Sequence, residues 1–197
     1  RDVCGGKENI VAVIGDGSLS GGEALEGLNC AGEYKGNYII IVNDNQMSIA
    51  ENHGGIYKNL KLLRETNGKA ELNWFRSMGL DYMYVSEGNN IEVLEAALSK
   101  VKDIDHPIIV HINTIKGKGL KYAETDKETW HWNNPFNIED GSPKHPFNGE
   151  TWAAINSNFL VKKAKEMPEM LVLAAGTPEG HGLNKEKREM LGNPYVA

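Results

Sequence analysis

Two continuous apolar runs lie near the start of the chain, at residues 10–14 and 38–42. Both are rich in β-branched residues and neither alternates with polar residues, which is typical of strands buried on both faces of a parallel sheet. Between them, residues 21–34 place Leu25 and Leu28 on one face of an expected helix. The pattern therefore predicts a strand, a helix and a second strand that form one βαβ unit.

The same alternation continues along the chain and predicts an α/β fold with a doubly wound parallel sheet. Over residues 133–150 the apolar periodicity fails and prolines recur, which predicts a linker. We therefore expect one domain over residues 1–132 and the first elements of a second α/β domain over residues 151–197. The further expected helices are residues 59–79 (with core positions Leu60, Leu63, Leu72 and Phe75), 91–101 and 151–166, and the further expected strands are residues 80–85, 107–113 and 171–175.

Polar triplets follow the first two apolar runs, at the point where each expected strand ends. They are Gly15-Asp16-Gly17 and Asn43-Asp44-Asn45. Ligands of open α/β sheets bind at the carboxyl ends of the strands. The Asp16 carboxylate and the Asn45 amide supply oxygen ligands suited to Mg²⁺, and the following helix N-terminus favours an anion. The pair predicts a magnesium and diphosphate site, whereas either triplet alone is better interpreted as an ordinary polar turn.

Composition narrows the class of protein. The net charge of −6 among 197 residues gives no basis for expecting a nucleic acid or a membrane surface as partner. No apolar run approaches membrane-spanning length. The two cysteines, Cys4 and Cys30, are too few for a disulfide framework and suit a reducing compartment.

The two triplets resemble the thiamine diphosphate motif, which begins with Gly-Asp-Gly and ends in a double-Asn turn. The surrounding residues resemble 1-deoxy-D-xylulose-5-phosphate synthase, a relative of transketolase, over nearly the whole chain. The segments that carry this resemblance are residues 18–22, 24–29 and 43–52, the Lys-Gly-Lys-Gly run at residues 116–119, Trp130-His131 and the Thr-Pro-Glu-Gly loop at residues 177–180.

The resemblance implies a thiamine diphosphate-binding fold with thiamine diphosphate and Mg²⁺ as cofactors. It implies that Asp16, Asn45 and the backbone carbonyl of Met47 bind the metal, and assigns a structural role to Asp44. His131 is the candidate catalytic residue, although a solvent-exposed loop histidine is an equal interpretation. The residues that it implies for cofactor binding are Asp16, Gly17, Ser18, Asn45, Met47 and Leu120.

The implied activity is the transfer of a two-carbon unit, most closely the condensation of pyruvate with glyceraldehyde 3-phosphate. Transketolase activity on sugar phosphates and a non-catalytic cofactor-binding subunit are the alternatives. A nucleotide-binding Rossmann module is disfavoured, because Gly15-Asp16-Gly17 is not the G-x-G-x-x-G fingerprint. The resemblance further implies a cytoplasmic protein that binds small-molecule substrates and forms a homodimer at full length.

The chain also departs from the family pattern. The segment 54–73 is much shorter than its counterpart, Asn89 replaces the usual His, and Leu120 replaces the usual Tyr. The family's earlier His-containing loops and its catalytic Glu have no counterpart here. We therefore expect a fragment, or alternatively a split subunit, that shows no turnover by itself and whose strand over 171–175 is unpaired.

Overall fold

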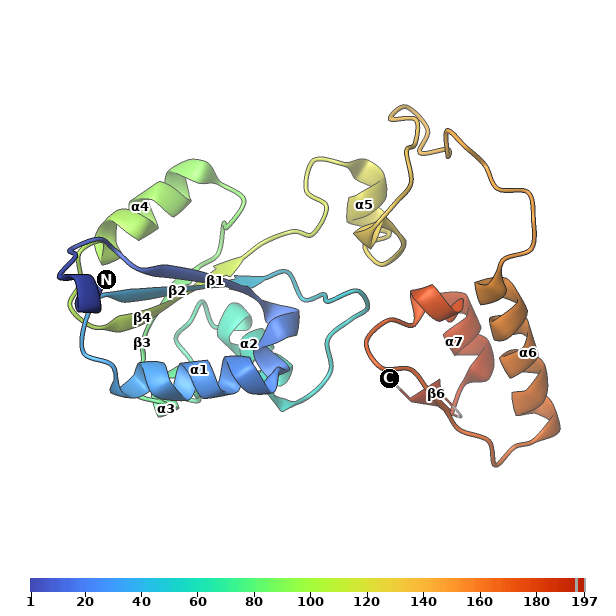
Figure 1. Ribbon diagram of the computed structural model, residues 1–197, viewed down its shortest axis with the longest axis horizontal. Coiled ribbons are helices and arrows are strands. Elements are labelled where there is room, and N and C mark those ends of the chain that lie inside the picture. Colours follow the sequence, from blue (N-terminus) through green and yellow to red (C-terminus); the bar gives the residue numbers. More distant parts are fainter. Residues whose placement is uncertain (194, 197) are drawn as a thin grey trace. The chain divides into compact units, whose positions relative to one another are not determined.

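The computed structural model describes residues 1–193 and 195–196 and divides into two compact units. The first unit is Arg1–Lys116 and the second is Gly117–Ala197 (Figure 1). The division thus falls before the segment 133–150 that the sequence predicts as a linker. Each unit has a sheet of its own.

The first unit is built on a four-stranded sheet in which every pair of neighbours is parallel. The strand order is β1-β2-β4-β3. After β2 the chain thus forms the edge strand β3 first, and β4 then lies between β2 and β3. The parallel sheet that the apolar runs predict is therefore confirmed. The strands are β1 (Val11–Gly15), β2 (Tyr38–Asp44), β3 (Asp81–Val85) and β4 (Pro107–Asn113).

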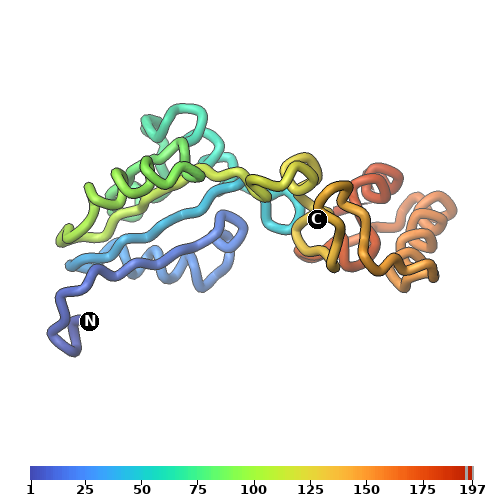
Figure 2. Tube along the Cα trace, turned by 90° about the horizontal axis from the view of Figure 1, so that it is seen from above, coloured from blue at the N-terminus to red at the C-terminus, as the bar shows by residue number. Residues whose placement is uncertain are grey.

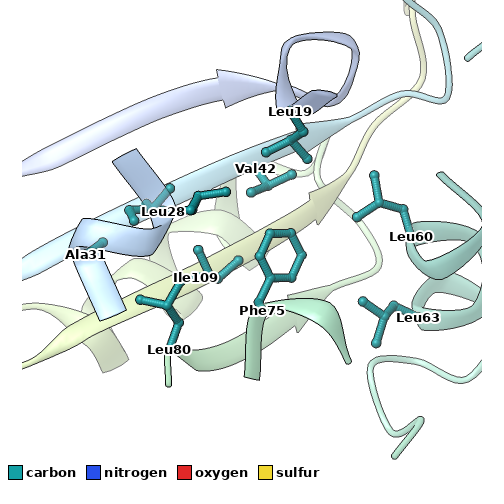
Figure 3. Packing of buried hydrophobic residues seen from close by; sticks show 10 residues of the cluster. Leu19, Leu28, Ala31, Val42, Leu60, Leu63, Phe75, Leu80 and Ile109 are labelled. Atoms are coloured by element: carbon teal, nitrogen blue, oxygen red, sulfur yellow. The ribbon is translucent and has the colours of Figure 1, made fainter. Parts of the chain in front are cut away.

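Helices cover both faces of this sheet, as a doubly wound fold requires (Figure 1). On one face α4 (Ile91–Val101) buries Ala97 and Val101 against the strands. On the other, α1 (Gly22–Glu33), α2 (Gly55–Glu65) and α3 (Trp74–Ser77) pack around Phe75, which is fully buried (Figure 3). Two 3₁₀ turns, η1 (Asp2–Cys4) and η2 (Asp16–Ser20), precede and follow β1.

The prediction that both early strands are buried on both faces is wrong for β1. It lies at one edge of the sheet beside β2 (Figure 2), and Val11 and Val13 are 49% and 69% exposed. Val11 is paired with Ile39, which is buried in the core that includes α4, but Val11 itself remains exposed. The apolar content of a strand does not report whether it is central or at an edge, because that depends on its neighbours in space.

The single helix predicted over residues 59–79 is also wrong, because two helices with an intervening turn occupy this region. After α2 ends, Asn67 and Gly68 both adopt positive φ angles of 48° and 74°. The side chain of Asn73 then caps α3 by accepting hydrogen bonds from the first helical amides. Leu72, an expected core residue, lies in the connection and is 71% exposed.

The second unit has its own small core of Val172, Ala174, Leu183 and Leu191. Strand β5 (Val172–Leu173) pairs in parallel with β6 (Tyr195–Val196), so the expectation of an unpaired strand is wrong. The helices and turns of this unit are α5 (Lys121–Thr125), η3 (Thr129–His131), α6 (Trp152–Glu166), η4 (Glu179–His181) and α7 (Lys185–Leu191).

Residues before the predicted linker belong to this second unit. Arg188 of α7 donates to both carboxylate oxygens of Glu128, at 2.6 and 2.7 Å. The ring of Trp130 stacks on Tyr122 at a centroid distance of 5.4 Å and meets Phe136 edge-on at 4.7 Å. Bidentate pairs of this kind fix geometry as well as charge. Across the described part of the chain, no helix has the length and apolar character needed to cross a membrane.

Candidate functional site

The carboxyl ends of β1 and β2 bring the two polar triplets side by side. The parallel register ends with Gly15 opposite Asn43, so the next residues, Asp16 and Asp44, follow at the same edge of the sheet. Both carboxylates are almost completely buried, at 2% and 0% exposed. The first unit therefore places the expected ligand-binding residues in one cluster, which we call the strand-end site: residues 15–18 and 43–48.

Asp16 begins η2, and the donors to its buried carboxylate are neutral groups. One oxygen accepts a hydrogen bond from Asn52 Nδ2 at 2.9 Å. Burial raises the pKa of Asp16 to about 6, and the negative charge of Asp44 raises it as well. Hydrogen bonds from the backbone amides of Gly17 and Gln46 lower the pKa but do not outweigh these two effects. Ionising Asp16 in this position therefore costs free energy that a bound cation would offset.

The turn after β2 is held by its own side chains. Asn45 Oδ1 accepts the Met47 backbone N–H and Asp44 Oδ1 accepts that of Gln46, each at 3.1 Å. Gln46 has a φ angle of 69°, a left-handed conformation that is uncommon for a residue other than Gly. Thr114, after β4, donates to Asn43 Oδ1 at 2.6 Å. This turn is thus a defined structure that presents the predicted ligands Asn45 and Met47.

Asp44 contrasts with Asp16 because cations and donors surround it. Its Oδ2 accepts a hydrogen bond from His111 Nε2 at 2.9 Å and forms an ion pair with Arg64 of α2. Burial by itself would raise the pKa of Asp44, but the hydrogen bond from His111 and the charge of Arg64 outweigh it and hold that pKa below its ordinary value. Asp44 is therefore an ionised structural centre behind the turn.

Gly17 is needed at this site because another loop approaches it closely. A Cβ atom built on Gly17 would lie 2.4 Å from Ser48 Oγ, whereas one on Gly15 would meet nothing within 4 Å. The Lys116 ammonium donates to the Ser48 carbonyl oxygen from the end of the first unit. Ser18, the remaining predicted residue of this triplet, is exposed and its carbonyl oxygen accepts the Gly21 N–H at 3.0 Å.

The donor set of the strand-end site fits magnesium. It offers one carboxylate with a raised pKa, one amide oxygen and backbone carbonyls, all of them hard oxygen ligands. Among the described residues there is no group of three or more His, Cys, Asp or Glu that could hold a metal. Any metal at this site would therefore need ligands beyond these side chains, such as backbone oxygens, phosphate oxygens and water.

Two predicted residues, Leu120 and His131, belong to the second unit and so lie outside the described geometry of the strand-end site. Leu120 is half-buried and precedes α5, and its N–H donates to the Gly117 carbonyl at 3.1 Å. His131 ends η3 and is exposed. Their assigned roles in cofactor binding and catalysis stay predictions.

Sequence reasoning missed three residues of this region: Asn52, Arg64 and His111. Arg64 carries no local signal, and Asn52 lies in the family-like segment 43–52 without any feature that points to Asp16. Each reaches its carboxylate only through the fold. His111 does carry one, since it interrupts the otherwise apolar run of β4 and is fully buried. A buried polar residue in an apolar strand needs a partner, and that requirement identifies it as part of a network.

The chain is similar to known proteins over most of its length. The sequence model described as 1-deoxy-D-xylulose-5-phosphate synthase matches residues 1–74 and 64–114. The match breaks into two pieces within the region where the segment 54–73 is shorter than expected for this family. The alignment with the relative from Trichormus variabilis likewise extends over 237 residues, although this chain has 197.

Two curated relatives carry the same name, 1-deoxy-D-xylulose-5-phosphate synthase. The protein from Listeria monocytogenes is 35% identical, with 94% of this chain and 32% of the relative covered. The protein from Trichormus variabilis is 32% identical, with 100% of this chain and 37% of the relative covered. The chain thus spans about a third of the length of these relatives.

Among solved structures, a transketolase mutant from Pichia stipitis matches 94% of this chain and 26% of its own, with 18% identity and a TM-score of 0.42. The family match covers more than half of the residues, and it includes both triplets of the strand-end site. On this basis the chain belongs to the 1-deoxy-D-xylulose-5-phosphate synthase family.

Proposed function

We propose that the protein containing this chain condenses pyruvate with glyceraldehyde 3-phosphate to form 1-deoxy-D-xylulose 5-phosphate and carbon dioxide. Thiamine diphosphate and Mg²⁺ would be its cofactors. The observation that carries the proposal is the juxtaposition of Asp16 with the Asn45–Met47 turn at neighbouring strand ends, in a chain of this family. The curated relatives named for this synthase support the choice of reaction.

In this proposal the first unit anchors the cofactor. Asp16, Asn45 and the Met47 carbonyl would hold Mg²⁺, which in turn would bind the diphosphate. The N-terminus of α1 has no side-chain cap, so its backbone amides are suited to an anion such as the diphosphate. When bound, thiamine diphosphate supplies the carbanion chemistry that removes carbon dioxide from a 2-keto acid. The proposed roles of His131 and Leu120 are contact with the substrate and with the cofactor, respectively.

The metal assignment is tested by replacing Asp16 in the full-length protein. Asp16→Ala should abolish Mg²⁺-dependent binding of thiamine diphosphate in calorimetry, because it removes the only carboxylate among the proposed ligands. Glu33→Gln is the matched control, since it removes an exposed carboxylate from the last turn of α1, at the opposite end from the proposed diphosphate site. Unchanged cofactor affinity in Asp16→Ala would contradict the assignment.

The reaction is tested by incubating the full-length protein with labelled pyruvate. Release of carbon dioxide that requires glyceraldehyde 3-phosphate supports the synthase. Consumption of a ketose phosphate without pyruvate would instead establish a transketolase, and cofactor binding without either reaction would establish a non-catalytic subunit. If His131 acts as an acid or base, His131→Ala should lower kcat about 100-fold while cofactor affinity is kept.

We also propose that the full-length protein is a cytoplasmic homodimer. Cys4 and Cys30 are exposed free thiols, a state that suits a reducing compartment. Light scattering coupled to size-exclusion chromatography measures the assembly, and a monomer at micromolar concentration would contradict the dimer.

A further inference from the structure

A chain of hydrogen bonds runs through the first unit from the edge strand β3 to the strand-end site. The Tyr82 hydroxyl lies 2.7 Å from His111 Nδ1, and His111 Nε2 lies 2.9 Å from Asp44 Oδ2. Asp44 Oδ1 in turn accepts the Gln46 N–H at 3.1 Å. Three strands, β3, β4 and β2, are thus joined by one polar path that ends in the turn carrying Asn45 and Met47.

Asp44 fixes the direction of its hydrogen bond with His111. Asp44 is an ionised acceptor, so His111 Nε2 carries the proton and donates it. Burial raises the pKa of Tyr82, so its hydroxyl stays protonated and pairs with the other imidazole nitrogen, Nδ1.

The rings around His111 hold it in the same orientation. Tyr82 and Tyr84 both meet the imidazole edge-on, at centroid distances of 5.9 and 5.2 Å, and Phe75 lies at 6.5 Å. Arg64 approaches Asp44 from α2 and supplies the compensating charge. The carboxylate of Asp44 is therefore fixed from behind by groups on α2, β3 and β4.

The hydrogen-bond path ends at the backbone N–H of Gln46, so it affects the geometry of the neighbouring proposed metal ligands. Gln46 lies between Asn45 and Met47 and is held in a left-handed conformation. Such a conformation persists in a residue other than Gly only where the surroundings enforce it. The hydrogen bond from the Gln46 N–H to Asp44 is one such constraint. This hydrogen bond can hold Gln46 in place only if the Asp44 carboxylate is itself held in place.

We propose that Tyr82 and His111 are positioning residues for the metal-binding turn: through Asp44 they hold Gln46, and hence Asn45 and Met47, in the geometry that binds Mg²⁺. This inference deepens the proposed function and rests on its assignment of the metal to this turn. Among the described residues, no hydrogen bond joins Tyr82 or His111 directly to the proposed metal ligands. Their effect is on metal affinity through Asp44, with no part in the chemistry itself.

The test compares two tyrosines on the same strand in the full-length protein. Tyr82→Phe removes only the hydroxyl that hydrogen-bonds to His111. Tyr84→Phe is the matched control, because its ring also packs on His111 while its hydroxyl makes no hydrogen bond to another described side chain. Calorimetric titration of Mg²⁺ in the presence of saturating thiamine diphosphate measures the affinity, and thermal unfolding of the metal-free protein measures stability separately.

We expect Tyr82→Phe to weaken Mg²⁺ binding about tenfold, the size usual for a lost supporting partner of a metal site. Tyr84→Phe should change the Mg²⁺ affinity by less than about twofold. At saturating Mg²⁺, kcat and the KM for substrate should both return to the parent values in Tyr82→Phe. His111→Gln is the second variant, with an expected loss of about 10- to 100-fold.

Equal Mg²⁺ affinity in Tyr82→Phe and the parent protein would overturn the inference alone. If metal-free Tyr82→Phe also unfolds at a lower temperature in that case, the hydroxyl has a structural role only. A parent protein that binds no thiamine diphosphate in the presence of Mg²⁺ would overturn the proposed function together with the inference.

Discussion

Asp16 and Asp44 end neighbouring strands, are equally buried, and nevertheless differ in the direction of their pKa shifts. Burial raises the pKa of Asp16 to about 6, while that of Asp44 is held below its ordinary value by His111 and Arg64 despite burial. The difference therefore lies in the partners. Asp44 faces a guanidinium and an imidazole N–H, whereas the side-chain donor to Asp16 is the neutral amide of Asn52.

This contrast separates a structural carboxylate from one suited to ligand binding. The Asp44 charge is already compensated, so a further cation would gain little there. The Asp16 charge is not compensated, which costs the folded protein free energy and favours a bound cation. Two carboxylates in similar positions thus differ in how far their charge is compensated, and substitutions at and around them test that difference.

The largest expected effect comes from removing the compensated charge. Asp44→Asn leaves the Arg64 guanidinium, with its side chain 15% exposed, without its carboxylate. We expect a loss of about 3 kcal/mol in the free energy of unfolding, because breaking a buried pair leaves one charge uncompensated. Urea titration of the parent and variant measures it, and a loss below about 1 kcal/mol would show that Arg64 finds another partner.

Asp16→Asn should act in the opposite direction. At pH 8 and without metal, it removes a buried charge that is costly to ionise, so we expect a gain of about 2 kcal/mol in the free energy of unfolding. The same variant should lose the stabilisation that Mg²⁺ and thiamine diphosphate give the parent protein. A destabilised metal-free variant would mean that the Asp16 charge has a compensating partner after all.

The pH dependence of stability follows from the same shifts. Between the ordinary pKa of 3.8 and about 6, the folded state holds a proton on Asp16 that the unfolded state has lost. The contribution of Asp16 to stability is therefore largest below this window and falls as the pH rises through it. Asp44 contributes with the opposite sign: its stabilisation is present above its ordinary pKa and is lost as the pH falls below it.

Urea titrations of the parent and of Asp16→Asn at a series of pH values isolate the first of these contributions. The difference between the two proteins should slope only between about pH 4 and 6. A difference that is constant over this range would contradict the raised pKa of Asp16.

The smallest expected effect concerns the two glycines that flank Asp16. Gly17→Ala forces a Cβ against Ser48, so we expect a loss of about 1 kcal/mol in the free energy of unfolding. Gly15→Ala meets open space and is the control, with a change of less than about 0.5 kcal/mol. Equal losses in the two variants would show that the loop carrying Ser48 moves aside freely.

Local sequence pattern is enough to predict the alternation of strands and helices in the first unit and the place of the two triplets. Continuous β-branched runs can be buried only in a sheet with covered faces, and parallel strands bring their carboxyl ends to one edge. Helix α4 and strand β4 have the bounds that the periodicity predicts. The edge position of β1 and the break after α2 were not predictable in this way.

Which of the two carboxylates is compensated depends on the tertiary structure. Asp44 and Asp16 have similar neighbours along the chain, but Arg64 and His111 reach Asp44 from α2 and β4, 20 and 67 residues away. Local pattern records which residues are apolar and where strands end. It does not record which distant side chains meet a buried charge, and at low dielectric those partners set its ionisation and hence its role.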